Sequence, residues 1–193
     1  MEIIDLFSTP LFYTKCNFDL DNIESDCIAK KIQDPNGVQL SNITGWQSQN
    51  ILLDDGLSNL KFLIKEIENI SREYVKALSL TSNVSAVASW ININPPGAFN
   101  QRHDHPLCLV SGVFYVKAPK DCGNIEFVHP SSAKMNRDWV DKQVRYAPCN
   151  SPAWSVEPEE NMLYIFPGWL EHTVYPNKSK EDRISISFNI SES

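Results

Sequence analysis

Beyond residue 80 the chain is a succession of short segments that are rich in β-branched and aromatic residues and are separated by proline, glycine and asparagine. These segments are VSAVASWININ, LCLVSGVFYVKA, GNIEFVHP, NMLYIFP and RISISFNI. Each segment predicts a short strand that ends in a turn. Five or more strands with no helical segment between them are typical of an antiparallel sandwich or barrel rather than of a parallel sheet.

The first 80 residues carry a helical pattern instead. Across residues 56–80, isoleucine, leucine and valine recur at mostly helical intervals with charged residues between them, which predicts an amphipathic helix. Ser58 is suited to cap the start of this helix. A shorter helix is expected around residues 22–33, because a strong turn signal, Asp-Pro-Asn-Gly, follows at residues 34–37.

Together these patterns predict a single domain over residues 1–193, mainly β with flanking α-helices. The helices of residues 1–80 would support a β-barrel core formed by residues 81–193. A chain of 193 residues of which 42% are hydrophobic can bury a sizeable core as one unit. Its net charge of −7, with scattered acidic residues and no basic stripe, argues against direct binding to nucleic acid.

The cysteines and the apolar segments bear on where the protein works. Five cysteines form an odd, widely spaced set without a Cys-x-x-Cys pair, which favours reduced thiols over a disulfide framework or a zinc knuckle. No apolar run approaches the roughly 20 residues that cross a bilayer, and the N-terminus lacks the pattern of a signal peptide. We expect a cytoplasmic protein without membrane association.

The last segment, RISISFNI, alternates polar and apolar residues without exception. One face of the strand would carry the apolar residues Ile184, Ile186, Phe188 and Ile190. The other face would carry the polar residues Arg183, Ser185, Ser187 and Asn189. A half-exposed strand would turn the polar face to solvent. Alternatively, Arg183 and Ser185 lie inside the mouth of a barrel and face a ligand. A partner site elsewhere in the chain has to decide between the two.

The chain contains four histidines, of which His103 and His105 are separated by a single residue. On a strand, side chains at positions i and i+2 point the same way with Cα atoms roughly 6.5 to 7 Å apart, so both imidazoles can reach one metal ion. A lone His-x-His pair beside proline fits two solvated histidines as well. His172, which follows a hydrophobic strand and a Pro-Gly turn 67 residues after His105, supplies a third candidate ligand.

The order of these residues is that of the Fe(II)- and 2-oxoglutarate-dependent oxygenases, with two ligands on an early barrel strand, a third on a late strand and an arginine on the next strand. Five motifs make the resemblance closer. They are W-x-N-x-N-x-x-G at residues 90–97, N-x-x-H-x-H-P at 100–106, S-G-V-x-Y-V at 111–116, I-F-P-x-W-x-x-H at 165–172 and R-I-S-I-S-F-N at 183–189. With these motifs the chain resembles a small family of 2-oxoglutarate- and Fe(II)-dependent oxygenases found in bacteria and phages.

The resemblance implies a fold, cofactors and a reaction. The fold is a double-stranded β-helix, the jelly-roll barrel that cupins share. Fe(II) is held by three protein ligands and chelated by the co-substrate 2-oxoglutarate, which leaves one position for O2. Oxidative decarboxylation releases succinate and CO2, and an organic substrate that the sequence does not identify is most simply hydroxylated.

The resemblance also assigns co-substrate residues. Arg183 is the candidate anchor for the distal carboxylate of 2-oxoglutarate, because a guanidinium offers a two-pronged donor that lysine lacks. Ser185 would donate a hydrogen bond from the same face. Asn92 on one strand, and Ser111 with Tyr115 on another, are weaker candidates for lining the co-substrate pocket, provided that their faces are the inner ones.

The metal ligands depart from the superfamily in one respect. The usual set is two histidines and a carboxylate, and the carboxylate stands two positions after the first histidine. Here that position is His105, so we predict three imidazole ligands, His103, His105 and His172. Asp104 would serve instead only if a local distortion turned its carboxylate inward. Three neutral ligands leave the site with the +2 charge of iron, which a 2-oxoglutarate dianion would neutralise.

The remaining histidine and the tryptophans receive structural or peripheral roles. His129 is expected to be structural, and Trp90 and Trp169 are expected to pack the barrel. Three other tryptophans flank irregular segments and fit either the wall of a substrate pocket or packing at an edge. They are Trp46, Trp139 and Trp154. Residues 130–160 are long for a connection and are a candidate lid over the substrate.

Two other functions compete with an oxygenase. A cupin-like metalloenzyme would use the same three histidines for ring cleavage, isomerisation or hydrolysis without 2-oxoglutarate, but Arg183 then has no required partner. A non-catalytic barrel with a binding or structural role would need no metal and would leave the polar face of residues 183–189 open to solvent. The oligomeric state stays open, a homodimer included.

Overall fold

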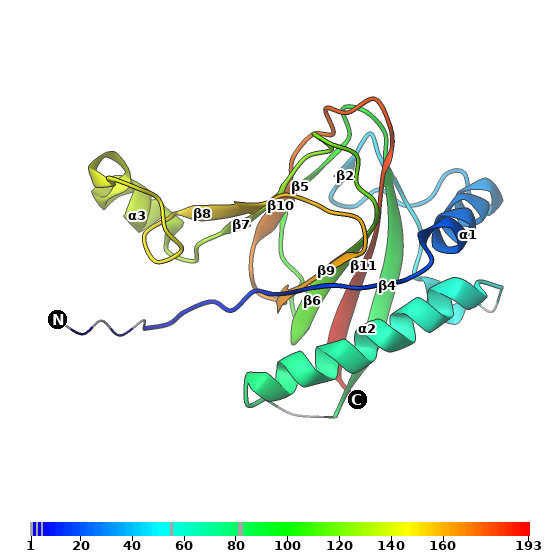
Figure 1. Ribbon diagram of the computed structural model, residues 1–193, viewed down its shortest axis with the longest axis horizontal. Coiled ribbons are helices and arrows are strands. Elements are labelled where there is room, and N and C mark those ends of the chain that lie inside the picture. Colours follow the sequence, from blue (N-terminus) through cyan, green and yellow to red (C-terminus); the bar gives the residue numbers. More distant parts are fainter. Residues whose placement is uncertain (1, 3, 5, 55, 81–82) are drawn as a thin grey trace.

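The structure is a computed structural model that describes residues 2, 4, 6–54, 56–80 and 83–193. Two antiparallel sheets lie face to face (Figure 1). The larger sheet has the order β1 (Phe12–Lys15), β9 (Met162–Pro167), β6 (Val110–Lys117), β11 (Arg183–Glu192), β4 (Val84–Asn94), β3 (Trp46–Gln47). The smaller sheet has the order β2 (Asn42–Ile43), β5 (Phe99–His103), β10 (His172–Val174), β7 (Ile125–Val128), β8 (Ala153–Val156).

Strands from the two sheets interleave along the chain, because β4, β6, β9 and β11 belong to the larger sheet whereas β5, β7, β8 and β10 belong to the smaller one. This is the connectivity of a double-stranded β-helix. The predicted fold, mainly β with flanking helices, is therefore confirmed. Among the described residues, no helix is both long enough and apolar enough to cross a membrane.

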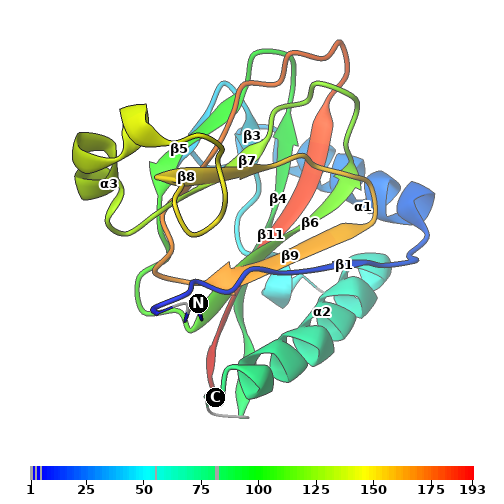
Figure 2. The same ribbon diagram turned by 60° about the vertical axis from the view of Figure 1, so that its left-hand side comes forward.

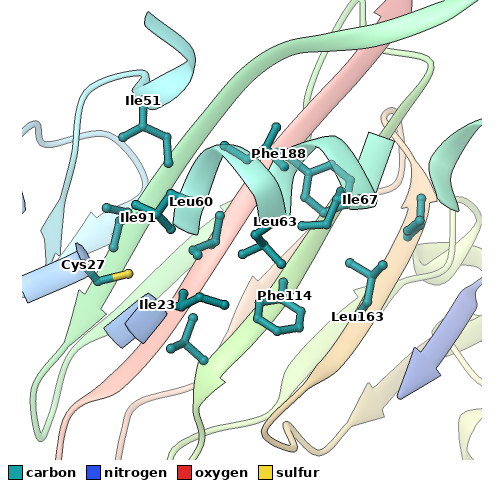
Figure 3. Close-up of a cluster of buried hydrophobic side chains, with 14 of the residues drawn as sticks. Ile23, Cys27, Ile51, Leu60, Leu63, Ile67, Ile91, Phe114, Leu163 and Phe188 are labelled. Carbon is teal, nitrogen blue, oxygen red and sulfur yellow. The ribbon is translucent and has the colours of Figure 1, made fainter. Parts of the chain in front are cut away.

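Helices α1 (Leu20–Gln33) and α2 (Ser58–Ala77) cover the outer face of the larger sheet (Figures 1 and 2). The apolar stripe of α2 packs on the apolar face of β11 and its neighbours. Figure 3 shows Leu63 and Ile67 of α2 beside Phe114 and Phe188 of the sheet, all of them buried. Because the apolar side of β11 is occupied by helices, its polar side has to face the interior between the sheets.

This helix-on-sheet core is expected to dominate stability. Leu63 is fully buried, so the substitution Leu63→Ala leaves a cavity under α2 and should lower the free energy of unfolding by about 3 kcal/mol. Urea unfolding followed by circular dichroism measures the change. The exposed neighbour Lys65 provides the control, since Lys65→Ala should stay within about 0.5 kcal/mol of the parent protein. Equal losses in the two variants would contradict this description of the core.

Helix boundaries agree with the sequence pattern except at one cap. Around residues 22–33 the predicted helix is present as α1, and the side chain of Asp19 caps it by accepting a hydrogen bond from the Asn22 N–H. Ser58 is the first residue of α2 and not its cap. The N-cap is Leu57, which makes no capping hydrogen bond and is buried, so this position contributes to packing instead.

Three short strands lie within the first 80 residues, where only helices were expected. β1 pairs with β9, β2 with β5 and β3 with β4, and all three stand at edges of the sheets. Strands of two to four residues are too short to show a recognisable alternation. A short 3-10 helix, η1 (Ile51–Leu53), leads from β3 toward α2.

The expectation that no helical segment interrupts the strands is also wrong. Helix α3 (Ser132–Asp138) and the 3-10 helix η2 (Val140–Lys142) lie between β7 and β8. Only Met135 of α3 is buried. A helix of two turns with one buried residue gives no periodic apolar signal in the sequence.

Candidate active site

Three histidine side chains converge between the two sheets. His103 is the last residue of β5 and His172 is the first residue of β10, and the two are paired across the sheet, so their side chains leave the same face. His105 lies in the loop after β5, where its N–H donates a 2.8 Å hydrogen bond to the Gly168 carbonyl. One ligand atom from each residue lies within 4.8 Å of the other two. This spacing lets a single ion contact all three imidazoles.

Backbone carbonyls fix the orientation of two of these rings. Nδ1 of His103 donates to the Gln101 carbonyl over 2.7 Å, and Nδ1 of His172 donates to the Leu170 carbonyl over 2.9 Å. A carbonyl oxygen only accepts, so Nδ1 carries the proton in both rings and the lone pair is on Nε2. Such hydrogen bonds are how proteins orient histidine ligands toward a metal.

Burial keeps the three imidazoles neutral. It lowers the pKa of His172 to about 3, with a further contribution from repulsion by His103, and lowers the pKa of His105 to about 4. The pKa of His103 is also lowered by burial, although its hydrogen bond to Gln101 and the charge of Asp104 oppose the shift. At neutral pH the cluster therefore offers three uncharged lone pairs, as a divalent metal ion requires.

The nearby carboxylates lie outside this cluster. Asp104 follows the end of β5, is exposed and is not part of the cluster, although it stands between His103 and His105 in the sequence. Glu171, next to His172, is half exposed and forms an ion pair with Arg102. Within the described part of the chain the cluster consists of the three histidines alone.

A cavity between the sheets connects the histidines to Arg183. Its wall is built by side chains from both sheets. They are Ser41, Trp90, Asn92, Asn100, His103, His105, Gly112, Val113, Tyr115, Ile125, Phe166, His172, Val174, Arg183, Ser185 and Ser187. His103 and His105 are half buried, whereas Arg183 is only 1% exposed, so the histidine end is the end nearer to solvent.

Arg183 is a buried cation with an unused donor. Its Nη1 donates to the carbonyls of Cys122, Gly123 and Tyr175 over 2.5, 3.3 and 3.3 Å. Its Nη2 is buried and has no hydrogen-bond partner, and no carboxylate of the described residues forms an ion pair with it. Burial lowers the pKa of Arg183, which reflects the cost of holding the charge there. An isolated buried charge is expensive, so this end of the cavity is suited to an anion that enters it.

The sequence pattern of the family described as "Putative 2OG-Fe(II) oxygenase" matches residues 88–189, more than half of the chain. The chain belongs to this family of oxygenases. It is therefore an enzyme that depends on Fe(II) and 2-oxoglutarate and uses O2 on an organic substrate. Both groups fit the residues present, because three neutral imidazoles suit a divalent metal and the free Nη2 of Arg183 suits a carboxylate.

Solved structures show the same fold at low sequence identity. A prolyl-4-hydroxylase from Pseudomonas putida has a TM-score of 0.69 and 16% identity over 96% of this chain and 94% of its own. A viral collagen prolyl hydroxylase from Paramecium Bursaria Chlorella virus-1, solved as a 2-oxoglutarate complex, has a TM-score of 0.61 and 14% identity over 95% and 96%. HygX from Streptomyces hygroscopicus, with nickel and 2-oxoglutarate bound, has a TM-score of 0.64 and 10% identity over 96% and 84%. No curated protein matches the chain.

In the oxygenase, three of the predicted polar residues form one row across the cavity wall. Ser185 of β11 is paired with Asn92 of β4 on one side and with Tyr115 of β6 on the other. Asn92 Nδ2 donates to Ser187 Oγ over 3.1 Å, while its Oδ1 is buried without a partner. The row therefore presents two hydroxyls and an amide to the cavity between Arg183 and the histidines.

Ser111 does not belong to this row. It is four residue pairs further along the sheet, opposite Asn189, and its hydroxyl donates to Asn189 Oδ1 over 2.8 Å. It is buried but does not line the cavity. Ser111 and Tyr115 share a strand face as expected, yet four residues of strand separate them by roughly 13 Å, which is too far for both to touch a small co-substrate.

Aromatic residues around the histidines were only partly anticipated. Trp90 packs against the His105 ring with centroids 5.6 Å apart, and Phe166 packs against the His172 ring at 4.8 Å. Trp90 was expected to pack the barrel and in fact lines its cavity, while Phe166, in the I-F-P motif, was overlooked. Trp169 is 52% exposed, so the expectation that it packs the barrel is wrong. It lies in the turn between β9 and β10, where a regular strand pattern no longer predicts direction.

The remaining tryptophans and His129 lie outside the cavity wall. Trp46 is buried, and its indole N–H donates to the Asp34 carbonyl over 2.8 Å. His129 Nδ1 accepts a 2.9 Å hydrogen bond from the Ser131 N–H just before α3, which is a structural contact. Trp139 and Trp154 are both exposed, one beside α3 and the other on β8.

Proposed function

We propose that the oxygenase hydroxylates an organic substrate at the histidine end of the cavity and releases succinate and CO2. In this proposal His103, His105 and His172 hold Fe(II), and Arg183 holds the distal carboxylate of 2-oxoglutarate. The observation that carries the proposal is the buried, unpartnered Nη2 of Arg183 in the same cavity as three neutral imidazoles. Bound Fe(II) with 2-oxoglutarate supplies the oxidising chemistry.

The protein side chains bind and orient the co-substrate. Three carbonyls fix Nη1 of Arg183, which leaves Nη2 as a preorganised donor on a side chain that lines the cavity. The hydroxyls of Tyr115 and Ser185, which lie on the same cavity wall, would donate to the same carboxylate. Rotating the Asn92 amide by half a turn lets Ser187 donate to Oδ1 and turns Nδ2 toward the co-substrate, since carbonyl and amino ends of an amide have the same shape.

Burial of this end of the cavity strengthens these contacts. Three neutral ligands leave the charge of the metal uncompensated, and Arg183 adds one more positive charge. A dianion would satisfy both charges in a buried cavity whose wall includes Trp90 and Phe166. We therefore expect the metal and 2-oxoglutarate to bind cooperatively.

The two competing functions fit less well. A cupin-like enzyme that does not use 2-oxoglutarate leaves the buried Nη2 of Arg183 without a partner. A non-catalytic barrel requires the polar face of β11 to be open to solvent, whereas Arg183 and Ser185 are buried.

We further propose that residues 130–160 gate access to the metal, since much of this segment projects beside the barrel (Figure 1). A cytoplasmic location in a bacterium or in a phage-infected cell is supported by the five free cysteines. The net charge of −7 supports an enzyme that does not bind nucleic acid directly.

An anaerobic titration tests the proposed site. Fe(II) held by the three histidines should give no visible band, and subsequent 2-oxoglutarate should produce a weak charge-transfer band, because a keto acid bound to the iron would supply a keto group that absorbs in this way. Succinate has the same distal carboxylate but no keto group, so it is the matched control and should give no band. If 2-oxoglutarate produces no band with iron-loaded protein, the proposed co-substrate site is wrong.

A further inference from the structure

Strand β8 is an open edge of the smaller sheet, because it stands last in the order β2-β5-β10-β7-β8. The His129 N–H donates to the Pro152 carbonyl, so this pair is a hydrogen-bonded one. Hydrogen-bonded pairs recur at every second residue of an antiparallel ladder, hence Trp154 directs its backbone groups toward β7 while Ala153 and Ser155 direct theirs outward. No described residue accepts from or donates to these outward groups. Such an edge is a template for another strand.

The side of this edge that faces the cavity carries a tryptophan in line with the metal-binding histidines. Residues His103, His172, Phe127 and Trp154 are paired in succession across four strands, so their side chains leave the same face. The Ser155 hydroxyl donates to Glu126 on the opposite face, in agreement with this alternation. Neighbouring strands lie about 4.8 Å apart, which places the Cα atom of Trp154 roughly 10 Å from that of His172. Trp154 is 41% exposed, so its indole is available for contact.

The segment between β7 and β8, residues 129–152 and here named the arm, differs in charge from the rest of the chain. It contains four basic and two acidic residues, a net charge of +2, so the remaining residues of the chain carry −9. Lys134 and Arg145 are exposed and form no ion pair with any described residue. The arm therefore favours an acidic partner, whereas the rest of the surface repels one.

The arm also exposes apolar side chains at several positions. Trp139, Val144 and Tyr146 are exposed and lie at intervals along it. Figures 1 and 2 show α3 and the ends of β7 and β8 projecting together from the barrel. An extended chain can contact this whole surface at once, because main-chain bonds along a strand edge combine with pockets for alternate side chains.

We propose that the substrate is a protein and that an extended, acidic segment of it adds to β8 as a further strand, with one of its side chains packed on Trp154. This inference rests on the proposed function, since it takes the histidine end of the cavity as the place of reaction. A strand added beyond β8 runs roughly 15 Å from His172. About five residues of extended chain span that distance, so the residue that reacts lies about five positions from the docked segment.

Binding of a synthetic acidic polypeptide tests the proposal. The probe is fluorescently labelled poly(Glu,Tyr), added to the full chain loaded anaerobically with Fe(II) and 2-oxoglutarate and followed by fluorescence anisotropy. We expect saturable binding that weakens at least about tenfold in Trp154→Ala and in Arg145→Glu. Ser155→Pro removes an outward N–H and should have the same effect, while Ser155→Ala, which loses only the hydroxyl, should bind normally. Tyr13→Ala removes an exposed aromatic from another edge strand, β1, and should also bind normally.

Hydrogen exchange distinguishes strand addition from diffuse attraction. Exchange at the amides of Ala153 and Ser155 should slow when the probe binds. Binding without this protection, or equal binding of polyadenylate, would overturn the proposal in favour of general attraction to polyanions. If Ser155→Pro fails to fold, Trp154→Ala and Arg145→Glu still decide.

Failure of this proposal is distinguishable from failure of the proposed function. No binding of poly(Glu,Tyr) by protein that still shows the charge-transfer band overturns the docking site and leaves the co-substrate site intact. Loss of the band in protein that binds the probe with the expected dependence on Trp154 overturns the co-substrate site and supports the docking surface.

Discussion

Replacing His172 by alanine is expected to abolish iron binding and, with it, the turnover of 2-oxoglutarate. His172 is the most buried of the three histidines and is the one that β10 contributes, so its loss leaves two half-buried rings from one short segment around β5. Removing a mere hydrogen-bond partner of a metal ligand costs about 10- to 100-fold in affinity, and loss of the ligand itself should cost more. Iron content after gel filtration and succinate released from 2-oxoglutarate measure the two effects.

Two matched controls make this result specific to the cluster. Asp104→Ala removes the carboxylate between His103 and His105, and iron binding should persist because Asp104 is exposed and lies outside the cluster. His129→Ala removes the histidine that contacts Ser131 and should also retain iron. Iron lost from Asp104→Ala but kept in His172→Ala would show that the carboxylate, and not the third imidazole, completes the site.

The direction of the polar face of β11 is an instance of what the sequence can predict. Strict alternation over residues 183–190 showed which side chains share a face but left the choice between solvent and interior open. The amphipathic helix predicted over residues 56–80 favours the interior. Its apolar stripe has to cover an apolar sheet face, which leaves the polar face of the same strand on the inner side. In the structure α2 covers the face of β11 that carries Ile186 and Phe188. Arg183 and Ser185, on the opposite face, line the cavity.

The positions of His105 and Trp169 show where sequence reasoning stops. Both lie just outside strands, one after β5 and one after β9, so the period of two no longer determines where their side chains point. The direction of His105 depends on its hydrogen bond to Gly168, a residue 63 positions away in the chain. Motif spacing predicted that His105 belongs to the candidate site. Its position depends on the hydrogen bond between the loop after β5 and the loop after β9, which the sequence does not show.

Registers between strands were likewise invisible in the sequence. Ser111 and Tyr115 are equivalent by alternation, yet only Tyr115 is opposite Ser185 and lines the cavity. The row that joins His172 to Trp154 through Phe127 depends on two registers and on an interrupting helix, α3. Faces of strands follow from local patterns, whereas neighbours across strands depend on contacts between distant segments.

Arg183→Lys is expected to raise the KM for 2-oxoglutarate by roughly 10- to 150-fold, with a smaller effect on kcat at saturating co-substrate. An ammonium group cannot contact three carbonyls through one nitrogen and present a second donor to a carboxylate, as Arg183 does with Nη1 and Nη2. A hydrogen bond between charged groups contributes about 1.5 to 3 kcal/mol, and the expected range of KM follows from that energy.

Stabilisation by the co-substrate gives a readout of this contact that does not depend on turnover. In metal-loaded parent protein, 2-oxoglutarate at 100 times its Kd should add about 2.7 kcal/mol to the free energy of unfolding, whereas the same concentration should add only about 0.4 kcal/mol if Arg183→Lys weakens binding 100-fold. Arg102→Lys is the matched control, since Arg102 lies beside His103 but is half exposed and pairs with Glu171. Equal KM values and equal stabilisation in the two variants would mean that the buried guanidinium does not hold the co-substrate, and its unpartnered Nη2 would then need another anion.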